Sequence, residues 1–180
     1  KAGIWLMIAT TLVFAAQDGI SRHLGTHYSI YMVVMVRFWF FALFVMAMAA
    51  RSEGGLRAAA SSAYPWVQLA RGVILVAEIA VMLVAFVKLG LIEAHAVFTC
   101  YPLLVAALSG PILGEKVGWR RWSAILVGFV GVLIILEPGF GVFSPWALVP
   151  LLSATMFAVY GLLTRYVARS DAASVSFFWT

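Results

Sequence analysis

The sequence predicts an all-α fold, a polytopic bundle of transmembrane helices. Three observations predict it: 64% of the 180 residues are hydrophobic, only 11% are charged, and the apolar residues form long uninterrupted runs. A soluble domain has about 45–50% apolar and about 25% charged residues, so the composition excludes soluble domains, and it also excludes disordered chains. A membrane β-barrel would alternate apolar and polar residues along its strands, and these runs do not alternate.

Six apolar segments are predicted to be helices in the membrane, and a seventh begins near the end of the chain. A span needs roughly 20 apolar residues, and a short connection adds about eight. The predicted helices are Ile4–Ser21, Tyr28–Ala50, Trp66–Val87, Ala94–Leu113, Trp122–Leu136 and Pro145–Tyr166, with the seventh starting at Ser174. The connections are short, and even the longest, Arg51–Ser62, leaves no room for a domain outside the membrane.

The basic residues predict the orientation of these helices. One side of the membrane collects eight of the 12 Lys and Arg residues, namely Lys1, Arg51, Arg57, Lys116, Arg120, Arg121, Arg165 and Arg169. The other side has Arg22 and Lys88, and Arg37 and Arg71 lie within spans. Cytoplasmic loops are enriched in Lys and Arg, so we expect a multi-pass protein of the inner (plasma) membrane with a cytoplasmic N-terminus. The net charge of +5 is then explained by the basic residues of the cytoplasmic loops, and we expect no nucleic-acid partner.

An internal repeat divides the chain. At an offset of 143 residues, Phe14 matches Phe157 and Ser21 matches Thr164. Because the second copy comes five helices later, it crosses the membrane in the opposite direction, as the charge asymmetry also requires. Inverted repeats place substrate sites at their interface and suit alternating access. We predict a first five-helix repeat over residues 1–137 and the start of an inverted second repeat over residues 145–180.

Several motifs resemble the EamA-type domain of the drug/metabolite transporter superfamily. They are the run YPLLVAALSGPILGEK over residues 101–116, the WRRW run over 119–122, GFVGV over 128–132, and the pairs Phe14-Ala15, Arg37-Phe38 and Arg71-Gly72. The resemblance implies ten helices in two inverted five-helix repeats, with both termini cytoplasmic. It also implies proton-coupled or facilitated movement of small metabolites, as in the YddG-like exporters of aromatic and other amino acids.

These features favour a secondary transporter that moves amino acids outward, and an importer or exporter of another small metabolite or drug is the alternative. A different class would be an intramembrane enzyme using Glu78 and His95, or a non-transporting membrane subunit with no cavity. The sequence contains no His-Glu-x-x-His, no Gly-x-Ser-x-Gly and no phosphate-binding Gly-rich loop. We therefore predict no catalytic residue, no cofactor and no metal site. The expected partners are a small-molecule substrate, the lipid bilayer and protons, and the oligomeric state stays open.

Charged residues inside the spans are the first candidates for function, because a charge at a helix centre costs at least about 2.5–3.5 kcal/mol. Arg37 and Glu78 each lie nine residues from the outer end of their helices, about 13 Å deep at ~1.5 Å per residue. We expect a structural ion pair between them, with substrate or proton binding as a second role for Glu78. Asp18 can pair with Arg22 one turn away. Alternatively, Asp18 forms an outer gate or proton-coupling site with His95.

The predicted substrate site is an apolar pocket with few polar groups near the middle of the membrane. Pro102 is expected to bend its helix beside Tyr101, whose ring can stack on a planar or cationic substrate. The predicted substrate-binding residues are Phe14, Gln17, Glu78, Met82, Phe98, Tyr101, Pro102, Phe157 and Tyr160. Gly114 is expected to cap a helix C-terminus, with Glu115 as the partner of nearby basic residues.

Overall fold

The computed structural model describes residues 2–51, 55–115, 118–135 and 145–180, and every element within these ranges is a helix. The helices are α1 (Ala2–His27), α2 (Ile30–Arg51), α3 (Gly55–Ala59), α4 (Pro65–Lys88), α5 (Leu91–Phe98), α6 (Tyr101–Leu113), α7 (Trp119–Ile135), the 3₁₀ turn η1 (Pro145–Ala147), α8 (Leu148–Val167) and α9 (Ala173–Phe178). Five stretches are long and apolar enough to cross a membrane: Gly3–His27, Ile30–Arg51, Pro65–Lys88, Leu91–Leu113 and Pro145–Val167. The predicted all-α membrane fold is confirmed.

Some predicted features fall outside the described residues. They are Lys1, Lys116, the predicted helix end at Leu136 and the predicted repeat boundary at residue 137. The described part of α7 is 17 residues long and corresponds to the predicted helix Trp122–Leu136.

The first predicted helix is longer than expected, because α1 continues past Ser21 to His27. Gly25 lies in this extension, and a Cβ atom there would come within 3.1 Å of Leu83 on α4. The extra turns of α1 therefore lie in close contact with α4. In the predicted connection Arg51–Ser62, the short helix α3 also forms.

The predicted helix Ala94–Leu113 is divided into two helices. It begins earlier, at Leu91, after Gly90 with a φ of 114°. It then breaks at Thr99 and Cys100, and α6 begins at Tyr101 with Pro102 in its first turn. Proline has no backbone N–H to donate to the carbonyl four residues earlier, so the α5 hydrogen-bond ladder cannot continue through Pro102. The bend expected at this proline is therefore a full break just before it.

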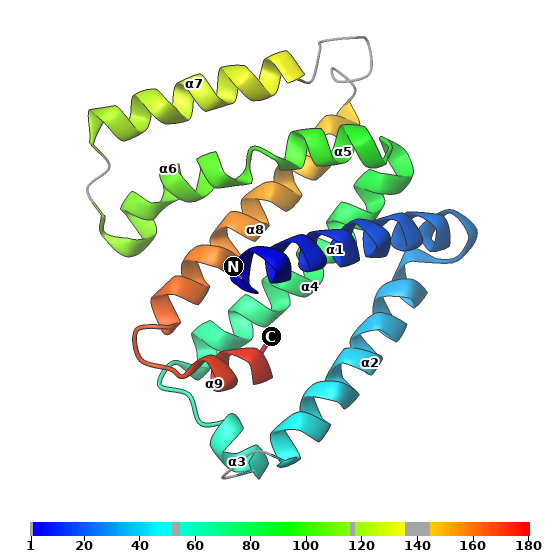
Figure 1. Cartoon of the computed structure of the whole chain (residues 1–180), viewed down its shortest axis with the longest axis vertical. Helices are drawn as coiled ribbons and strands as arrows, with labels where there is room; N and C mark the ends of the chain where they lie inside the picture. The colour runs from blue at the N-terminus through cyan, green and yellow to red at the C-terminus, as the bar shows by residue number, and fades with distance from the viewer. Residues whose placement is uncertain (1, 52–54, 116–117, 136–144) are drawn as a thin grey trace.

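Helix α8 lies at the centre of the fold, between α4 and α6 (Figure 1). Its contact with α4 is the most extensive between any two described helices, followed by its contact with α6. Ala154 and Ala158 of α8 are completely buried, and Ala154 packs beside the buried Cys100. Small residues at these positions let the helix backbones approach closely.

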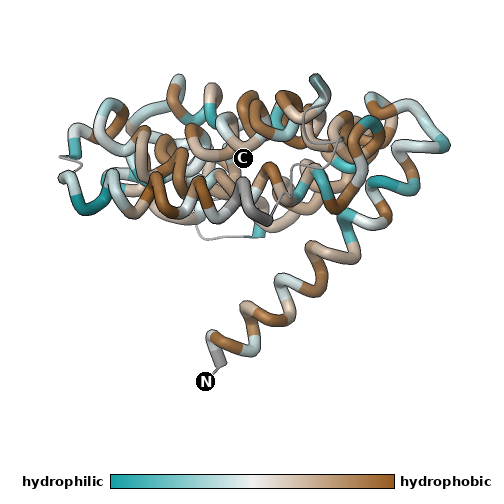
Figure 2. The backbone as a smooth tube through the Cα atoms, turned by 90° about the horizontal axis from the view of Figure 1, so that it is seen from above, coloured by the Kyte–Doolittle hydropathy of each residue, from teal (hydrophilic) through white to brown (hydrophobic). Residues whose placement is uncertain are grey.

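The outer helices expose apolar side chains, as expected for a protein in lipid. The N-terminal half of α1 extends away from the other helices (Figure 2), and Trp5 is 71% exposed. On α7, Gly128 permits a close approach to α6, because a Cβ there would come within 2.8 Å of Leu103. Gly131 on the same helix has no such role, because a Cβ there would touch nothing within 4 Å.

Candidate functional site

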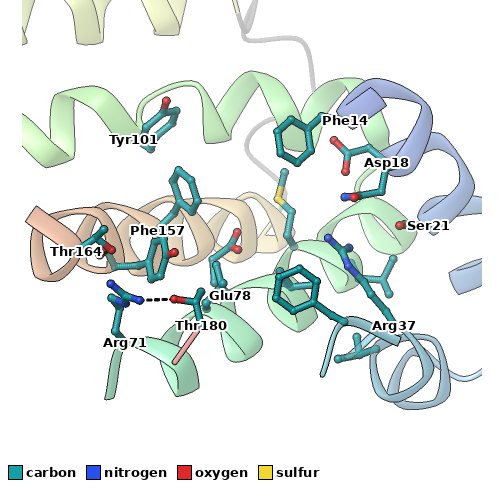
Figure 3. Close-up of a pocket in the computed structure, with 18 of the residues that line it drawn as sticks. Phe14, Asp18, Ser21, Arg37, Arg71, Glu78, Tyr101, Phe157, Thr164 and Thr180 are labelled. Carbon is teal, nitrogen blue, oxygen red and sulfur yellow. Dashed lines mark hydrogen bonds between the residues drawn. The ribbon is translucent and has the colours of Figure 1, made fainter. Parts of the chain in front are cut away.

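A cavity of about 970 Å³ lies between α1, α2, α4, α8 and α9 and is bordered by α5 and α6 (Figure 3). Its volume is at the upper end of the range for small-molecule sites, roughly 300–1,000 Å³. Most of the predicted substrate-binding residues line it, namely Phe14, Gln17, Glu78, Met82, Phe98, Tyr101, Phe157 and Tyr160. Asp18, Arg37 and His95 line it as well. Pro102 does not line it, because its ring lies exposed in the first turn of α6.

One side of the cavity is a continuous set of rings that we call the aromatic wall: Phe98, Tyr101, Phe157 and Tyr160. The Tyr101 and Phe157 rings meet edge to face with centroids 5.1 Å apart, and Phe98 lies 5.5 Å from Phe157. Tyr160 extends the wall along α8, with its ring centroid 6.0 Å from that of Phe157. All four side chains are partly exposed to the cavity, so they can stack against a flat ligand.

Glu78 projects from α4 toward the cavity (Figure 3) and is only 5% exposed. The hydroxyl of Ser153 on α8 donates a hydrogen bond of 2.7 Å to its Oε1 atom. The expected ion pair with Arg37 is not among the ion pairs of the described residues, although both side chains line the same cavity. The described residues thus show no direct contact of that pair: Ser153 provides the close partner of Glu78, and Arg37 acts on the carboxylate through its charge alone.

Asp18 and His95 meet across the α1–α5 contact, with His95 Nε2 3.1 Å from Asp18 Oδ2. Asp18 therefore pairs with His95 and not with Arg22. The other ring nitrogen, Nδ1, lies 3.0 Å from the backbone oxygen of Leu91, which can only accept. A neutral imidazole has one N–H, and here both nitrogens face acceptor oxygens. The two hydrogen bonds form together only when the Asp18–His95 pair holds one additional proton.

Arg71 is a cavity residue that the sequence analysis did not assign to the site. It is 1% exposed, and its Nη2 donates to the backbone oxygen of Ser176 and to the hydroxyl of Thr180. Its guanidinium carbon also lies 5.6 Å from the centroid of the Tyr160 ring. An arginine inside an apolar span is itself a signal for function. Arg71, like Arg37, is a charged residue inside a predicted span, and this signal was sufficient to predict it as a site residue.

The α8–α9 connection is fixed to the start of α4 by the Asp171 carboxylate, which also lines the cavity. It accepts hydrogen bonds from the Ser62 hydroxyl, the Ala63 N–H at 2.8 Å and the Gln68 amide at 2.8 Å. The hydrogen bond from Ser62 is the main reason that the pKa of Asp171 is lower than usual, and the bonds from Ala63 and Gln68 and the charge of Arg71 act in the same direction. The partners of Asp171 are more than 100 residues distant in the sequence, so no local pattern predicts this contact.

Glu115 lies outside this cavity, where it contacts two arginines. Its carboxylate is 3.5 Å from Arg121 and 2.7 Å from Arg165 of α8. The contact of Glu115 with Arg121 is the expected one with a nearby basic residue, and its contact with Arg165 was not expected. Gly114 ends α6 in the left-handed conformation, with a φ of 71°, as expected for a helix cap.

A multi-pass membrane helix bundle that encloses a small-molecule cavity is the architecture of solute carriers. The comparison with protein families agrees, because the model of the EamA-like transporter family matches residues 1–137. The chain belongs to this family.

Curated relatives are named for two kinds of solute. The chain is 25% identical to an S-adenosylmethionine uptake transporter of Rickettsia prowazekii over 98% of this chain and 59% of the relative. It is 27% identical to a riboflavin transporter of Brucella anthropi over 94% of this chain and 60% of the relative. A riboflavin transporter of Vibrio cholerae is 38% identical over 46% of this chain and 28% of the relative. The chain thus spans about 60% of the length of the Rickettsia and Brucella relatives, and no solved structure matches.

The low pKa of Asp171 predicts how stability depends on pH. Folding stabilises the ionised carboxylate, so this contribution is complete above the ordinary Asp pKa and disappears as the pH falls through the lowered value. Asp171→Asn should therefore melt at a lower temperature than the wild type at neutral pH, and the two should converge on acidification. Thermal unfolding in detergent from about pH 7 to about pH 3 measures this. Glu93→Gln controls for the loss of an exposed negative charge, and a difference that does not vary with pH would contradict the assignment.

Proposed function

We propose that this chain forms the binding part of an inner-membrane secondary transporter that moves a small, flat-ring metabolite by alternating access. The observation that carries the proposal is the cavity itself, in which the aromatic wall faces the carboxylates of Glu78 and Asp18. Since the sequence has no phosphate-binding Gly-rich loop, the driving force is proposed to be an ion or solute gradient.

The substrate class that fits the cavity has a heteroaromatic ring and a positively charged group. The ring stacks on Tyr101 and Phe157, and the positive charge lies near Glu78, which is buried and has a single hydrogen-bond donor. S-Adenosylmethionine, named for the Rickettsia relative, has both features, whereas riboflavin, named for the Brucella relative, offers the ring. An aromatic amino acid, the substrate favoured by the sequence, is the second candidate because the aromatic wall also accepts its ring.

The direction we propose is import. The Rickettsia relative is named an uptake transporter, which supports the importer alternative of the sequence analysis over the outward movement of amino acids. The charge asymmetry supports a cytoplasmic N-terminus. In this orientation Asp18 and His95 lie toward the outside, and Asp171 lies toward the cytoplasm.

The inverted repeat is also part of the proposal, with a first repeat over residues 1–137 and the second beginning at 145. Matched positions at the 143-residue offset line the same cavity: Phe14 with Phe157, Gln17 with Tyr160, and Ser21 with Thr164. In Figure 1, α1 and α8 run in opposite senses across the view. Both observations support a cavity built from equivalent faces of two inverted copies.

Proton coupling is assigned to the Asp18–His95 pair, because both of its hydrogen bonds require one shared proton. Release of that proton breaks one of the two hydrogen bonds of His95, and loss of the bond to Asp18 removes the contact that His95 makes with α1. Loading and release of one proton can therefore change the closure of the cavity at this end.

The aromatic wall supplies the first test of the proposed function. Tyr101→Ala in the full-length protein should raise the KM for S-adenosylmethionine uptake into proteoliposomes roughly 3- to 10-fold, because an aromatic pair contributes ~0.5–1.5 kcal/mol beyond its buried area. Phe129→Ala on α7, outside the cavity, is the matched control and should leave KM unchanged. Wild-type kinetics in a folded Tyr101→Ala protein would contradict this substrate site.

Coupling is tested with His95→Gln, which keeps an N–H donor near Asp18 but cannot carry a proton. The variant should lose accumulation of substrate driven by an imposed proton gradient and keep gradient-independent exchange of labelled for unlabelled substrate. Both modes are measured in the same proteoliposomes. Accumulation at the wild-type level in His95→Gln would exclude the pair from coupling.

A further inference from the structure

Arg71 is the most buried charged residue of the described structure and one of its least satisfied. Its guanidinium has five N–H donors, of which the two on Nη2 face Ser176 and Thr180. The Nε and Nη1 atoms are buried and have no hydrogen-bond partner. Three N–H groups of a buried cation are thus left unpaired, an arrangement that costs free energy unless an anion satisfies them.

The nearest acidic residue does not supply that anion. Asp171 is close enough to affect Arg71 electrostatically, but its carboxylate is held by Ser62, Ala63 and Gln68. No ion pair between Arg71 and Asp171 forms among the described residues. Gln68 donates its amide Nε2 to Asp171, so that carboxylate is satisfied by groups other than the Arg71 guanidinium.

The position of the guanidinium is fixed on three sides. Helix α9 holds Nη2 through Ser176 and Thr180, and the Tyr160 ring lies 5.6 Å from the guanidinium carbon. The chain just after α9 also lies close to α4, because a Cβ at Gly72 would come within 2.8 Å of the Trp179 backbone oxygen. In Figure 3 the Arg71 side chain extends from α4 toward Phe157 and Thr164, with Thr180 beside it. A guanidinium that is held in place and lines the cavity is preorganised for a ligand.

Arg71 and Glu78 also stand on the same face of α4. They are seven residues, two helical turns, apart, which separates them by roughly 10 Å along the axis at ~1.5 Å per residue. Leu75 lines the cavity between them. The cavity therefore has a buried cation and a buried carboxylate two helical turns apart on α4, with Asp171 near Arg71, Arg37 near Glu78 and the aromatic wall in the same lining.

We propose that Arg71 is the carboxylate-binding residue of the substrate site, so that the substrate class is a flat-ring solute with both a carboxylate and a cationic group. The carboxylate accepts from the unpaired N–H groups of Arg71, the cation faces Glu78, and the ring stacks on Phe157. This assignment rests on the proposed transport function and narrows it. It favours amino-acid derivatives such as S-adenosylmethionine over riboflavin, which has no carboxylate.

The test compares ligands that differ only in the carboxylate. S-Adenosylmethionine and its decarboxylated analogue form one pair, and tryptophan and tryptamine form a second. Each of these solutes is added as a competitor in an uptake assay with the full-length protein in proteoliposomes. Riboflavin is included as a flat-ring solute that has neither a carboxylate nor a cationic group. We expect the wild type to favour the carboxylated member roughly 10- to 100-fold, the range for hydrogen bonds to a charged group. Arg71→Gln should reduce that preference to near unity and leave the affinity for the decarboxylated member unchanged.

Two further variants make the result specific to Arg71. Arg37→Gln removes the other cavity arginine and should keep the carboxylate preference, so loss of the preference there instead would overturn the assignment. Arg71→Lys keeps the charge and should give an intermediate carboxylate preference. This variant replaces Arg71→Gln in the test if Arg71→Gln does not fold, and a carboxylate preference equal to that of the wild type would then overturn the proposal.

The remaining outcomes separate this proposal from the transport function. If Arg71→Gln lowers the affinity for both members of a pair equally, the role of Arg71 is only structural and the proposal is overturned. Transport of riboflavin without any carboxylated solute overturns it and leaves the transporter assignment intact. Absence of transport for every solute overturns the proposed function and this inference together.

Discussion

The packing of α8 against α4 is the contact on which the rest of the structure depends. Small side chains on α8, Ala154 and Ala158, are fully buried, so the helix fits between α4 and α6. The same contact contains the hydrogen bond from Ser153 to Glu78, which satisfies one oxygen of a carboxylate buried at membrane depth. With α8 in place, the rings of Phe157 and Tyr160 face the charged side of α4 across one cavity. Close helix contact thus creates the candidate site as well as the fold.

The charges of the cavity are arranged at separate places, and each has a different kind of partner. Asp18 and His95 pair at the α1–α5 contact, with their closest atoms 3.1 Å apart. Glu78 has a neutral partner, and Arg71 has two neutral acceptors and a ring. A charge with only neutral partners in a low-dielectric site interacts strongly with an arriving ligand of the opposite sign. In the proposed site, these charges would select solutes by charge and the aromatic wall would select for a flat ring.

Much of the fold follows from the sequence, because long apolar runs in a membrane can only form helices or barrels. Cavity residues such as Phe14 and Tyr160 were also predictable, since depth along each helix follows from counting residues. Contacts between helices were not predictable in the same way. The depth of a residue in the membrane does not predict that Ser153, and not Arg37, contacts Glu78. It also does not predict the contact of Asp171 with Ser62. Those contacts depend on the rotation and crossing of helices that are distant in the sequence.

We propose that the cavity between α1, α2, α4, α8 and α9 is a water-accessible path for the substrate. The most direct measurement places a single cysteine in the full-length protein, after Cys100→Ala, and follows its reaction with a water-soluble thiol reagent. Leu75→Cys in the cavity should react and be slowed by saturating S-adenosylmethionine, while Val127→Cys on the exposed face of α7 should stay unreactive in lipid. A Leu75→Cys protein that reacts no faster than Val127→Cys, or at the same rate with and without substrate, would contradict the account.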